Sequence, residues 1–150
     1  MPSLTVDTPT GPFTICEEDG QITRANWGGE AREETDLLRE ASSQIEAYFA
    51  GERTDFDLPL NVMGSDLQKA VCDAMLAIPF GQTRTYGDLA KDLGVPAQAI
   101  GQACGGNPIG LIIPCHRILG ANGLGGFSAI HGVETKVALL KHEGAASLLI

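Results

Sequence analysis

The sequence predicts an α/β protein with two lobes, in which sheet-forming residues precede a mainly helical part. Residues 3–27 alternate between apolar and polar side chains and are interrupted by turn-forming pairs, as expected for short strands. Residues 35–52, and the chain from residue 65 onward, instead show apolar positions at helical spacing. With 150 residues, the chain is long enough for one domain or for two small lobes that share a core.

The first lobe is expected to contain three strands and one helix. The strands are predicted at "SLTVDT" (3–8), "GPFTICEE" (11–18) and "QITRANWG" (21–28), with Asp19-Gly20 as a hairpin turn. The helix, "TDLLREASSQIEAYFAGE", is stopped by its glycine near the end. Its apolar stripe consists of Leu37, Leu38, Ala41, Ile45, Tyr48 and Phe49.

A proline-containing, partly extended linker over 53–64 separates the two lobes. We therefore assign residues 1–60 to an N-terminal α/β lobe and residues 61–150 to a C-terminal domain.

The C-terminal domain is expected to begin with a helix that Pro79 and Gly81 end. Ser65 and Gln68 have the spacing of a capping box at its start. The predicted buried face of this helix is Leu67, Ala70, Val71, Ala74, Met75 and Ile78.

Two further short helices are joined by a glycine. Thr85 and Asp88 begin "TYGDLAKDL", Gly94 makes a sharp turn, and Pro96 begins "PAQAIGQAC". This is the helix-turn-helix pattern, which many small domains contain and which by itself is a weak indication of DNA binding.

The end of the chain is predicted to be a loop followed by a helix. Within the loop, residues 107–126, the apolar stretch "IGLII" is expected to be a buried strand-like segment that delivers Cys115. The helix "VETKVALLKHEG" is expected to face inward with Val137, Leu139 and Leu140 and to be capped by Gly144.

The net charge of −9 argues against a general nucleic-acid-binding protein. All of the excess charge lies in residues 1–65, which contain thirteen acidic and four basic residues, whereas residues 66–150 contain six of each. The second half of the chain can therefore still approach DNA. The chain has no apolar run near the about 20 residues of a membrane helix, and its N-terminus does not resemble a secretory signal. We expect a cytoplasmic protein without a membrane partner.

Four cysteines are present, at 16, 72, 104 and 115, and no two have the close spacing of a zinc or thioredoxin motif. We expect neither disulfides nor a metal or other cofactor. Cys115 lies in "LIIPCHRILGANGLGG", and three interpretations remain open at this point: a buried small apolar residue, a metal ligand, or a nucleophile. The adjacent His116 cannot pair with this thiol on an extended chain, so a nucleophile would need a turn of the backbone here.

The stretch "IPCHRILG", preceded by "GNP" and followed by a glycine loop and "LLKHEG", resembles the methylated-DNA–protein-cysteine methyltransferases. The resemblance covers at least residues 64–144 and includes "LQKAVCDAMLAIPFGQTRTYGDLA". It implies a ribonuclease-H-like first lobe and a helical, winged-helix-like second lobe with the helix-turn-helix. The implied function is repair of guanine alkylated on O-6, with the base flipped out of the duplex and the alkyl group moved irreversibly to the protein's own cysteine.

The resemblance also implies roles for individual residues. Cys115 is the expected alkyl acceptor, His116 accepts its proton through a water, and Glu143 orients the histidine. Tyr86 is expected to donate to the flipped guanine, and Asn107 to hold the cysteine loop. The DNA-binding candidates are Thr85, Tyr86, Ala97, Gln98, Gly101 and Arg117, with helix 97–104 in the minor groove. Of these, Arg117 is expected to anchor the loop rather than to touch the base.

The chain departs from the family pattern at several positions. Gln98 replaces the arginine that fills the space of the flipped base, and residues 92–116 contain no Lys or Arg, so we expect weak attraction to phosphates. Gly110 stands where proline is common, which predicts a looser loop. The loop at 124–135 is longer than usual and carries Phe127 in place of tyrosine, and no role is assigned to Ser128 or His131.

Three functions are compared. The first is a single-turnover alkyltransferase acting as a monomer on alkylated double-stranded DNA. The second is a non-catalytic, alkyltransferase-like protein that flips and binds the lesion, but such proteins usually lack the cysteine that is present here as Cys115. The third, a cysteine hydrolase, lacks an oxyanion-hole signature beside Cys115.

Overall fold

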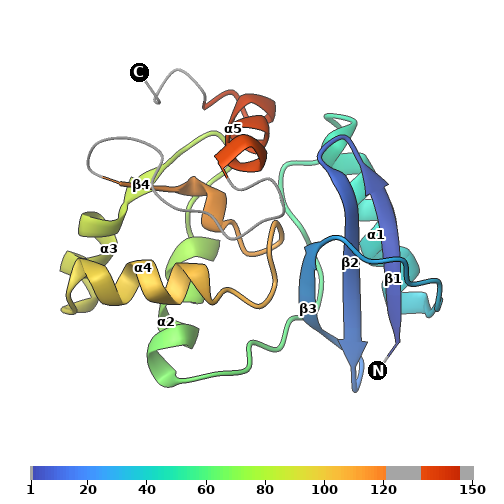
Figure 1. Cartoon of the computed structure of the whole chain (residues 1–150), viewed down its shortest axis with the longest axis horizontal. Coiled ribbons are helices and arrows are strands. Elements are labelled where there is room, and N and C mark those ends of the chain that lie inside the picture. The colour runs from blue at the N-terminus through green and yellow to red at the C-terminus, as the bar shows by residue number, and fades with distance from the viewer. Residues whose placement is uncertain (1, 121–132, 146–150) are drawn as a thin grey trace. The chain divides into compact units, whose positions relative to one another are not determined.

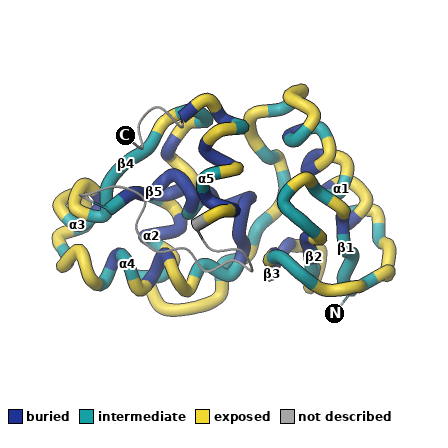
Figure 2. The backbone as a smooth tube through the Cα atoms, turned by 45° about the horizontal axis from the view of Figure 1, so that its top comes forward, coloured by how far each residue is buried: buried dark blue, intermediate teal, exposed yellow. Residues whose placement is uncertain are grey.

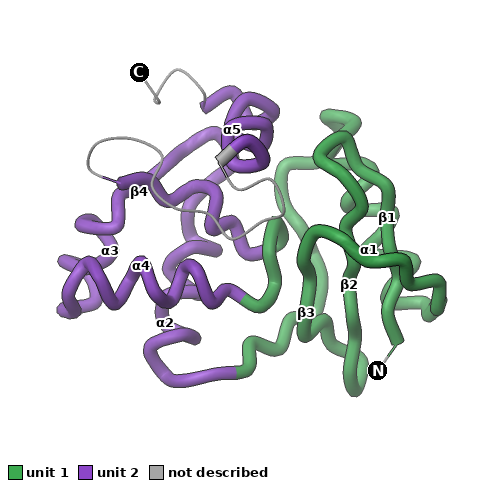
Figure 3. The backbone as a smooth tube through the Cα atoms, viewed as in Figure 1, with its two compact units in different colours: residues 1–63, 108–112 green, residues 64–107, 113–150 purple. Residues whose placement is uncertain are grey.

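A computed structural model describes residues 2–120 and 133–145 (Figure 1). The chain forms two compact units, one of residues 1–63 and 108–112 and the other of residues 64–107 and 113–150 (Figure 3). The first unit carries the three-stranded sheet and one helix, and the second carries the remaining helices and a short two-stranded sheet. This arrangement confirms the predicted α/β class with a sheet-bearing first part and a helical second part.

The first unit is built on an antiparallel sheet of order β1-β2-β3. The strands are β1 (Ser3–Thr8), β2 (Gly11–Glu18) and β3 (Gln21–Trp27), which confirms the three predicted strands to within one residue. Alternate residues of β2 point into the core, where Phe13 and Ile15 are fully buried. The core of this unit therefore lies on one face of the sheet.

Helix α1 (Asp36–Phe49) supplies the other side of this core. The side chain of Thr35 accepts a hydrogen bond from the Leu38 amide and caps the helix. Of the six residues in the predicted stripe, Leu37 and Phe49 are only half-buried. Gln44 is also buried, which was not predicted. Its side-chain amide donates to the Asp57 carbonyl and accepts from the Asp57 amide, so it fixes the linker to the helix.

The outer edge of β3 is closed by two segments from far along the chain. The amide of Ile22 donates to Pro59, and the amide of Ala25 donates to Pro108. Residues 108–112 therefore pack within the first unit, although they run directly toward Cys115. They form an isolated bridge at Ile109 rather than the predicted strand-like segment.

Gly110 is held firmly, which contradicts the prediction that glycine loosens this loop. Its amide donates to the Ala25 carbonyl at 2.8 Å, a bond that proline could not make. A Cβ at this position would lie 3.3 Å from both the Ala25 oxygen and a ring carbon of Trp27. Glycine permits the close approach of this segment to the strand edge.

The second unit begins with α2 (Asp66–Leu76), which Ser65 caps by accepting from the Gln68 amide. The Gln68 side chain does not complete the predicted capping box, because it donates to the Ala103 carbonyl at 2.8 Å instead. The buried positions of α2 include Cys72, which was not predicted from the sequence. Three of the predicted positions, Leu67, Ala70 and Ala74, are only half-buried.

The predicted helix-turn-helix is present as α3 (Tyr86–Leu93) and α4 (Ala97–Gly105). Thr85 and Asp88 form a complete capping box, and the hydrogen bonds from Thr85 hold the pKa of the Asp88 carboxyl below its usual value. Gly94 turns the chain in the left-handed conformation, with φ of 67°.

Three short elements of the second unit position Cys115. A 3₁₀ turn, η1 (Cys115–Arg117), leads into β5 (Ile118–Leu119), which pairs in parallel with β4 (Arg84–Thr85). None of these three elements was predicted from the sequence, since each is shorter than a periodic pattern can reveal.

Helix α5 (Val133–His142) ends the described chain. Leu139 and Leu140 are buried as predicted, but Val137 is half-buried, whereas Thr135 and Lys136 are buried. Figure 2 shows the buried course of β5 beside this helix. Phe127, Ser128 and His131, together with most of the 124–135 loop, lie outside the described residues. Across the described ranges, no helix is long and apolar enough to cross a membrane.

Two glycines of the helix-turn-helix should respond to alanine in opposite ways. Gly94→Ala should lower the free energy of unfolding by about 1 kcal/mol, because a side chain is unfavourable in the left-handed conformation. Gly101→Ala should raise it by up to about 1 kcal/mol, because this glycine lies within α4 and no described atom outside the helix is within 4 Å of the new Cβ. Urea denaturation of both variants tests this, and changes of the same sign would contradict these backbone assignments.

Candidate active site around Cys115

Cys115 lies at the start of a tight backbone turn. Its amide donates to the Ile113 carbonyl at 2.8 Å, and the Arg117 amide donates to Pro114 at 3.0 Å. The backbone therefore turns where a nucleophilic cysteine requires it to, and Cys115 remains half-buried rather than part of the closed core. Burial raises the pKa of the Cys115 thiol, so it needs a proton acceptor to react at neutral pH.

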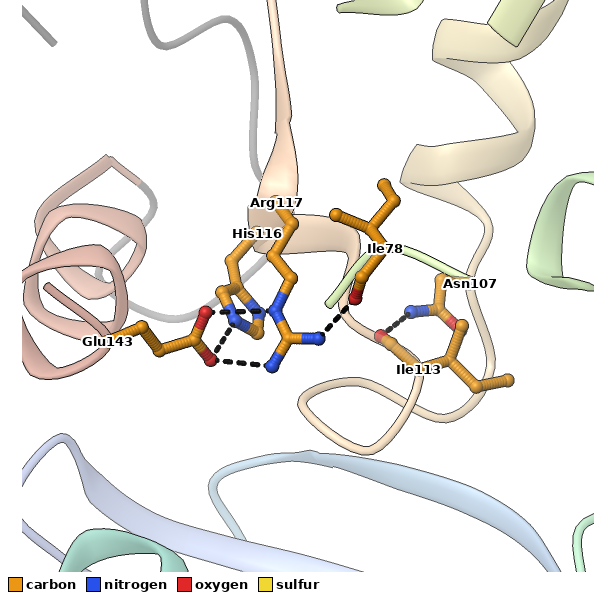
Figure 4. A network of polar contacts seen from close by, with 6 residues as sticks. All are labelled: Ile78, Asn107, Ile113, His116, Arg117 and Glu143. Carbon is orange, nitrogen blue, oxygen red and sulfur yellow. Dashed lines mark hydrogen bonds and ion pairs between the residues drawn. The ribbon is translucent and has the colours of Figure 1, made fainter. Parts of the chain in front are cut away.

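Asn107 braces this turn from the end of α4. Its side-chain amide donates to the Ile113 carbonyl at 2.9 Å, as Figure 4 shows. Its own backbone amide donates to Cys104 at 3.2 Å. A hydrogen bond from Asn107 to the thiol acts on the Cys115 pKa in the opposite direction to burial. Asn107 therefore contacts both the loop and the sulfur.

His116 is fully buried and bonds to Glu143 through one ring nitrogen. Its Nε2 lies 2.8 Å from Oε2 of Glu143. Burial lowers the pKa of His116, and the interaction with Glu143 opposes this shift in part. In the neutral ring, a carboxylate partner requires Nε2 to carry the proton, so Nδ1 holds a free electron pair. Among the described residues, that buried Nδ1 has no hydrogen-bond partner.

Glu143 is shared between His116 and Arg117. Nε and Nη2 of Arg117 donate to the two carboxylate oxygens at 2.8 and 2.9 Å, and Nη1 donates to the Ile78 carbonyl at 2.6 Å (Figure 4). The Glu143 side chain is fully buried, and Arg117 is 9% exposed. The arginine offsets the cost of placing a carboxylate at the end of α5. This geometry favours the expected anchoring role of Arg117 over its other candidate role in contacting DNA.

Tyr86 is the first residue of α3 and lies near the thiol. Burial raises the pKa of its phenol, and electrostatic interactions with Cys104 and Cys115 raise it further. The phenol therefore keeps its proton at neutral pH and is a hydrogen-bond donor. The parallel pairing of β4 with β5 places Tyr86 close to the chain that leaves the cysteine turn.

Lys136 was not predicted as a site residue. It is fully buried in α5, and its ammonium lies 6.0 Å from the centre of the Tyr86 ring. A signal was present, because Lys136 precedes Leu140 by four positions and Glu143 by seven and so lies on the same helical face.

The remaining DNA-binding candidates lie on the accessible side of α4 and at the start of α3. Ala97 and Gln98 are exposed and Gly101 is half-buried, whereas Ile100 lies in the core on the opposite side. The Thr85 hydroxyl is occupied by the capping box. Within the described ranges, no group of three His, Cys, Asp or Glu side chains could hold a metal ion.

Arg117 should make a large contribution to stability through its bonds with buried Glu143. Arg117→Met should lower the free energy of unfolding by about 3–5 kcal/mol, because Glu143 would lose its charged partner. It should also raise the pKa of His116, which the arginine charge lowers. Chemical denaturation and imidazole NMR titration measure the two effects. As a control, Arg39→Met removes an exposed ion pair with Asp36 and should change little. Equal behaviour of the two variants would show that the buried network does not stabilise the fold.

The chain matches two family models. Residues 66–145 match the DNA-binding domain of 6-O-methylguanine DNA methyltransferase, and residues 3–62 match its ribonuclease-like domain.

Similar proteins cover almost the whole chain. A methylated-DNA–protein-cysteine methyltransferase from Methanosarcina acetivorans is 41% identical over 151 residues, covering 93% of this chain and 96% of the relative. One from Mycobacterium tuberculosis strain H37Rv is 40% identical, covering 93% and 90%. The crystal structure of the M. tuberculosis O6-methylguanine methyltransferase has a TM-score of 0.86 at 38% identity, over 97% of this chain and 93% of that one. A crystal structure of M. tuberculosis OGT in complex with DNA has a TM-score of 0.87 at 38% identity, over 97% and 94%. Since both family domains occur in order and similarity extends along the chain, this chain belongs to the 6-O-methylguanine DNA methyltransferase family.

Proposed function

We propose that this protein repairs DNA by moving the alkyl group from O-6 of guanine to the sulfur of Cys115, once per molecule. The observation that carries the assignment of Cys115 is the buried His116 beside it, which Glu143 holds through Nε2 and whose Nδ1 bonds to no residue that the structure describes. This is the arrangement of an activated nucleophile: a thiol, a base and a group that orients the base.

The proton of the thiol passes through one water to Nδ1 of His116. The buried Nδ1 lacks a partner among the described residues, and a bridging water would satisfy it. Glu143 then stabilises the imidazolium that forms, while Arg117 keeps the carboxylate in position. The low pKa of His116 leaves the ring neutral and able to accept the proton.

The sulfur attacks the alkyl carbon while the bond from that carbon to O-6 breaks. The electron pair of the broken bond stays on the guanine, which takes up one proton to balance the one that the thiol gave to His116, so the products are guanine and S-alkylcysteine. Tyr86, as a protonated phenol, donates to the flipped base and stabilises its developing negative charge. No ordinary side chain hydrolyses the thioether, so the reaction stops after one equivalent.

The substrate is alkylated double-stranded DNA, approached by the exposed side of α4. Ala97 and Gln98 are exposed there, and Gly101 leaves space for close approach of a backbone. The lesion base must leave the stack to reach a half-buried thiol, at a cost of a few kcal/mol. Gln98 can hydrogen-bond the orphaned cytosine but adds no charge near the phosphates.

We further propose that the protein acts as a monomer in the cytoplasm, where its four free thiols would stay reduced. The alternative of a non-catalytic lesion-binding protein is disfavoured by Cys115, since a protein that only binds needs neither the thiol nor a base beside it.

Incubation with a duplex that contains O-6-methylguanine should add one methyl group, about 14 Da by the mass of CH₂, to the Cys115 peptide. Intact-mass and peptide mass spectrometry should find no more than one equivalent. Cys115→Ser should bind the same duplex without any mass change. Methylation of Cys16, Cys72 or Cys104, or repeated turnover, would refute the assignment.

Gln98→Arg should tighten DNA binding and speed repair of duplex more than repair of single strands, because only the duplex leaves a gap in the stack for the arginine to fill. The salt dependence of binding should steepen by about one phosphate contact. Transfer rates on both substrates across a salt series measure this. Gln102→Arg, at another exposed position of α4, is the matched control. If Gln98→Arg affected the two substrates equally, α4 would have no part in base flipping.

A further inference from the structure

Lys136 is a buried charge that the transfer reaction, as proposed above, leaves without a role. Its side chain is fully buried within α5. Among the residues that the structure describes, no carboxylate forms an ion pair with it, since buried Glu143 is engaged by Arg117 and His116. A buried ammonium without a charged partner is costly and is normally replaced or neutralised. Such a lysine therefore needs another reason to be where it is.

The position of the ammonium is fixed by one hydrogen bond and one ring. Nζ of Lys136 donates to the Ile118 carbonyl at 2.5 Å. Ile118 follows the cysteine turn directly and pairs with Arg84, the residue two before Tyr86. Nζ lies 6.0 Å from the centre of the Tyr86 ring, within the range of a cation–π contact. One amine thus links α5, the exit of the cysteine turn and the start of α3.

A neutral hydrogen-bond donor would satisfy the Ile118 carbonyl equally well, so the hydrogen bond does not explain the charge. The groups that face the amine are Cys115 and His116 from η1, Cys104 from α4 and Tyr86 from α3. None of them is an anion at neutral pH before the reaction begins. Negative charge forms here when the Cys115 proton leaves, and the electrostatic interaction of Lys136 with Cys115 favours the thiolate.

We propose that Lys136 is a positioning residue for alkyl transfer, whose buried ammonium stabilises the Cys115 thiolate while it holds the Tyr86 ring beside the sulfur. This inference rests on the proposed function, and it concerns the charge of the side chain rather than its hydrogen bond. The ammonium donates no proton in the step: the thiol proton goes to His116, and the sulfur electron pair forms the new bond to carbon.

The charge should be lost within an accessible pH range, because burial lowers the pKa of Lys136 to about 8. Below that pH the thiolate forms next to a cation, and above it next to a neutral amine. Ordinarily the observed alkylation rate of a cysteine rises tenfold per pH unit below the thiol pKa, because the fraction of thiolate rises tenfold. In the native protein the rise for Cys115 should therefore become shallower above pH 8.

The test uses iodoacetamide on the full chain without DNA, with the Cys115 peptide followed by mass spectrometry from pH 6 to pH 9.5. Lys136→Gln keeps a donor for the Ile118 carbonyl but removes the charge, and Lys136→Arg keeps the charge over the whole range. Lys141→Gln, an exposed lysine of the same helix, is the matched control. Methyl transfer from a duplex with O-6-methylguanine is measured in parallel, with the affinity for that duplex.

Lys136→Gln should alkylate about threefold more slowly at pH 7. Loss of the positive charge raises the thiol pKa and so lowers the fraction of thiolate, while the remaining thiolate is somewhat more nucleophilic. Methyl transfer should slow by at least as much, with duplex affinity unchanged. Lys136→Arg should match the native protein at pH 7 and lack its shallower rise above pH 8. Lys141→Gln should match it at every pH.

A native rate for Lys136→Gln at pH 7 would overturn the inference. If that variant fails to fold, Lys136→Arg still decides the question, because a pH profile parallel to the native one up to pH 9.5 would overturn it equally. The proposed function fails separately, if the native protein reacts with iodoacetamide at Cys115 but takes no methyl group from the duplex.

Discussion

The carboxylate of Glu143 is the interaction on which the site depends. It lies just beyond the end of α5 and is fully buried, and its two oxygens accept hydrogen bonds from Arg117 and His116. Both partners come from the three-residue turn that also contains Cys115. Because a buried carboxylate cannot remain unpaired without a large cost, α5 and the turn are fixed to one another. The same bonds that stabilise the second unit also set the tautomer of His116. A substitution of Glu143 would therefore change both the free energy of unfolding and the proton acceptor next to Cys115.

The charges of Arg117 and Glu143 cancel, and the other groups around the high-pKa thiol of Cys115 stay neutral, apart from Lys136. Arg117 neutralises Glu143, so the carboxylate only partly opposes the effect of burial and His116 stays neutral. Burial also keeps the Cys115 thiol and the Tyr86 phenol protonated. The resting site therefore contains a protonated thiol, a neutral imidazole and a protonated phenol, which are the proposed nucleophile, base and donor. Lys136 contributes the one positive charge near the sulfur that no carboxylate cancels among the described residues.

Much of the fold was predictable because local signals were strong. The first two strands of the first unit alternate cleanly, and the capping residues Thr35, Ser65 and Thr85 stand where their helices begin. What could not be predicted was set by contacts between distant segments. The Gln68 side chain bonds to Ala103 instead of its own cap, and Gly110 joins the edge of β3, so each residue has a role that its neighbours in sequence do not reveal. For the site, a family pattern pointed to Cys115, His116 and Glu143, whereas Lys136 was passed over because a lysine in a helix is usually exposed.

The addition of residues 108–112 to the edge of β3 affects how the protein can fold and how it can be divided. A fragment that begins after the linker would take these residues away from their sheet and expose Ile109, Leu111 and Ile112, all of which are buried in the intact chain. Their backbone partner, Ala25, would in turn lose both of its bonds at the strand edge. Pairing between segments so distant in sequence raises the contact order, which slows folding. The helical part is therefore not a freely transferable module, because the segment that leads into Cys115 needs the sheet-bearing part as its packing partner.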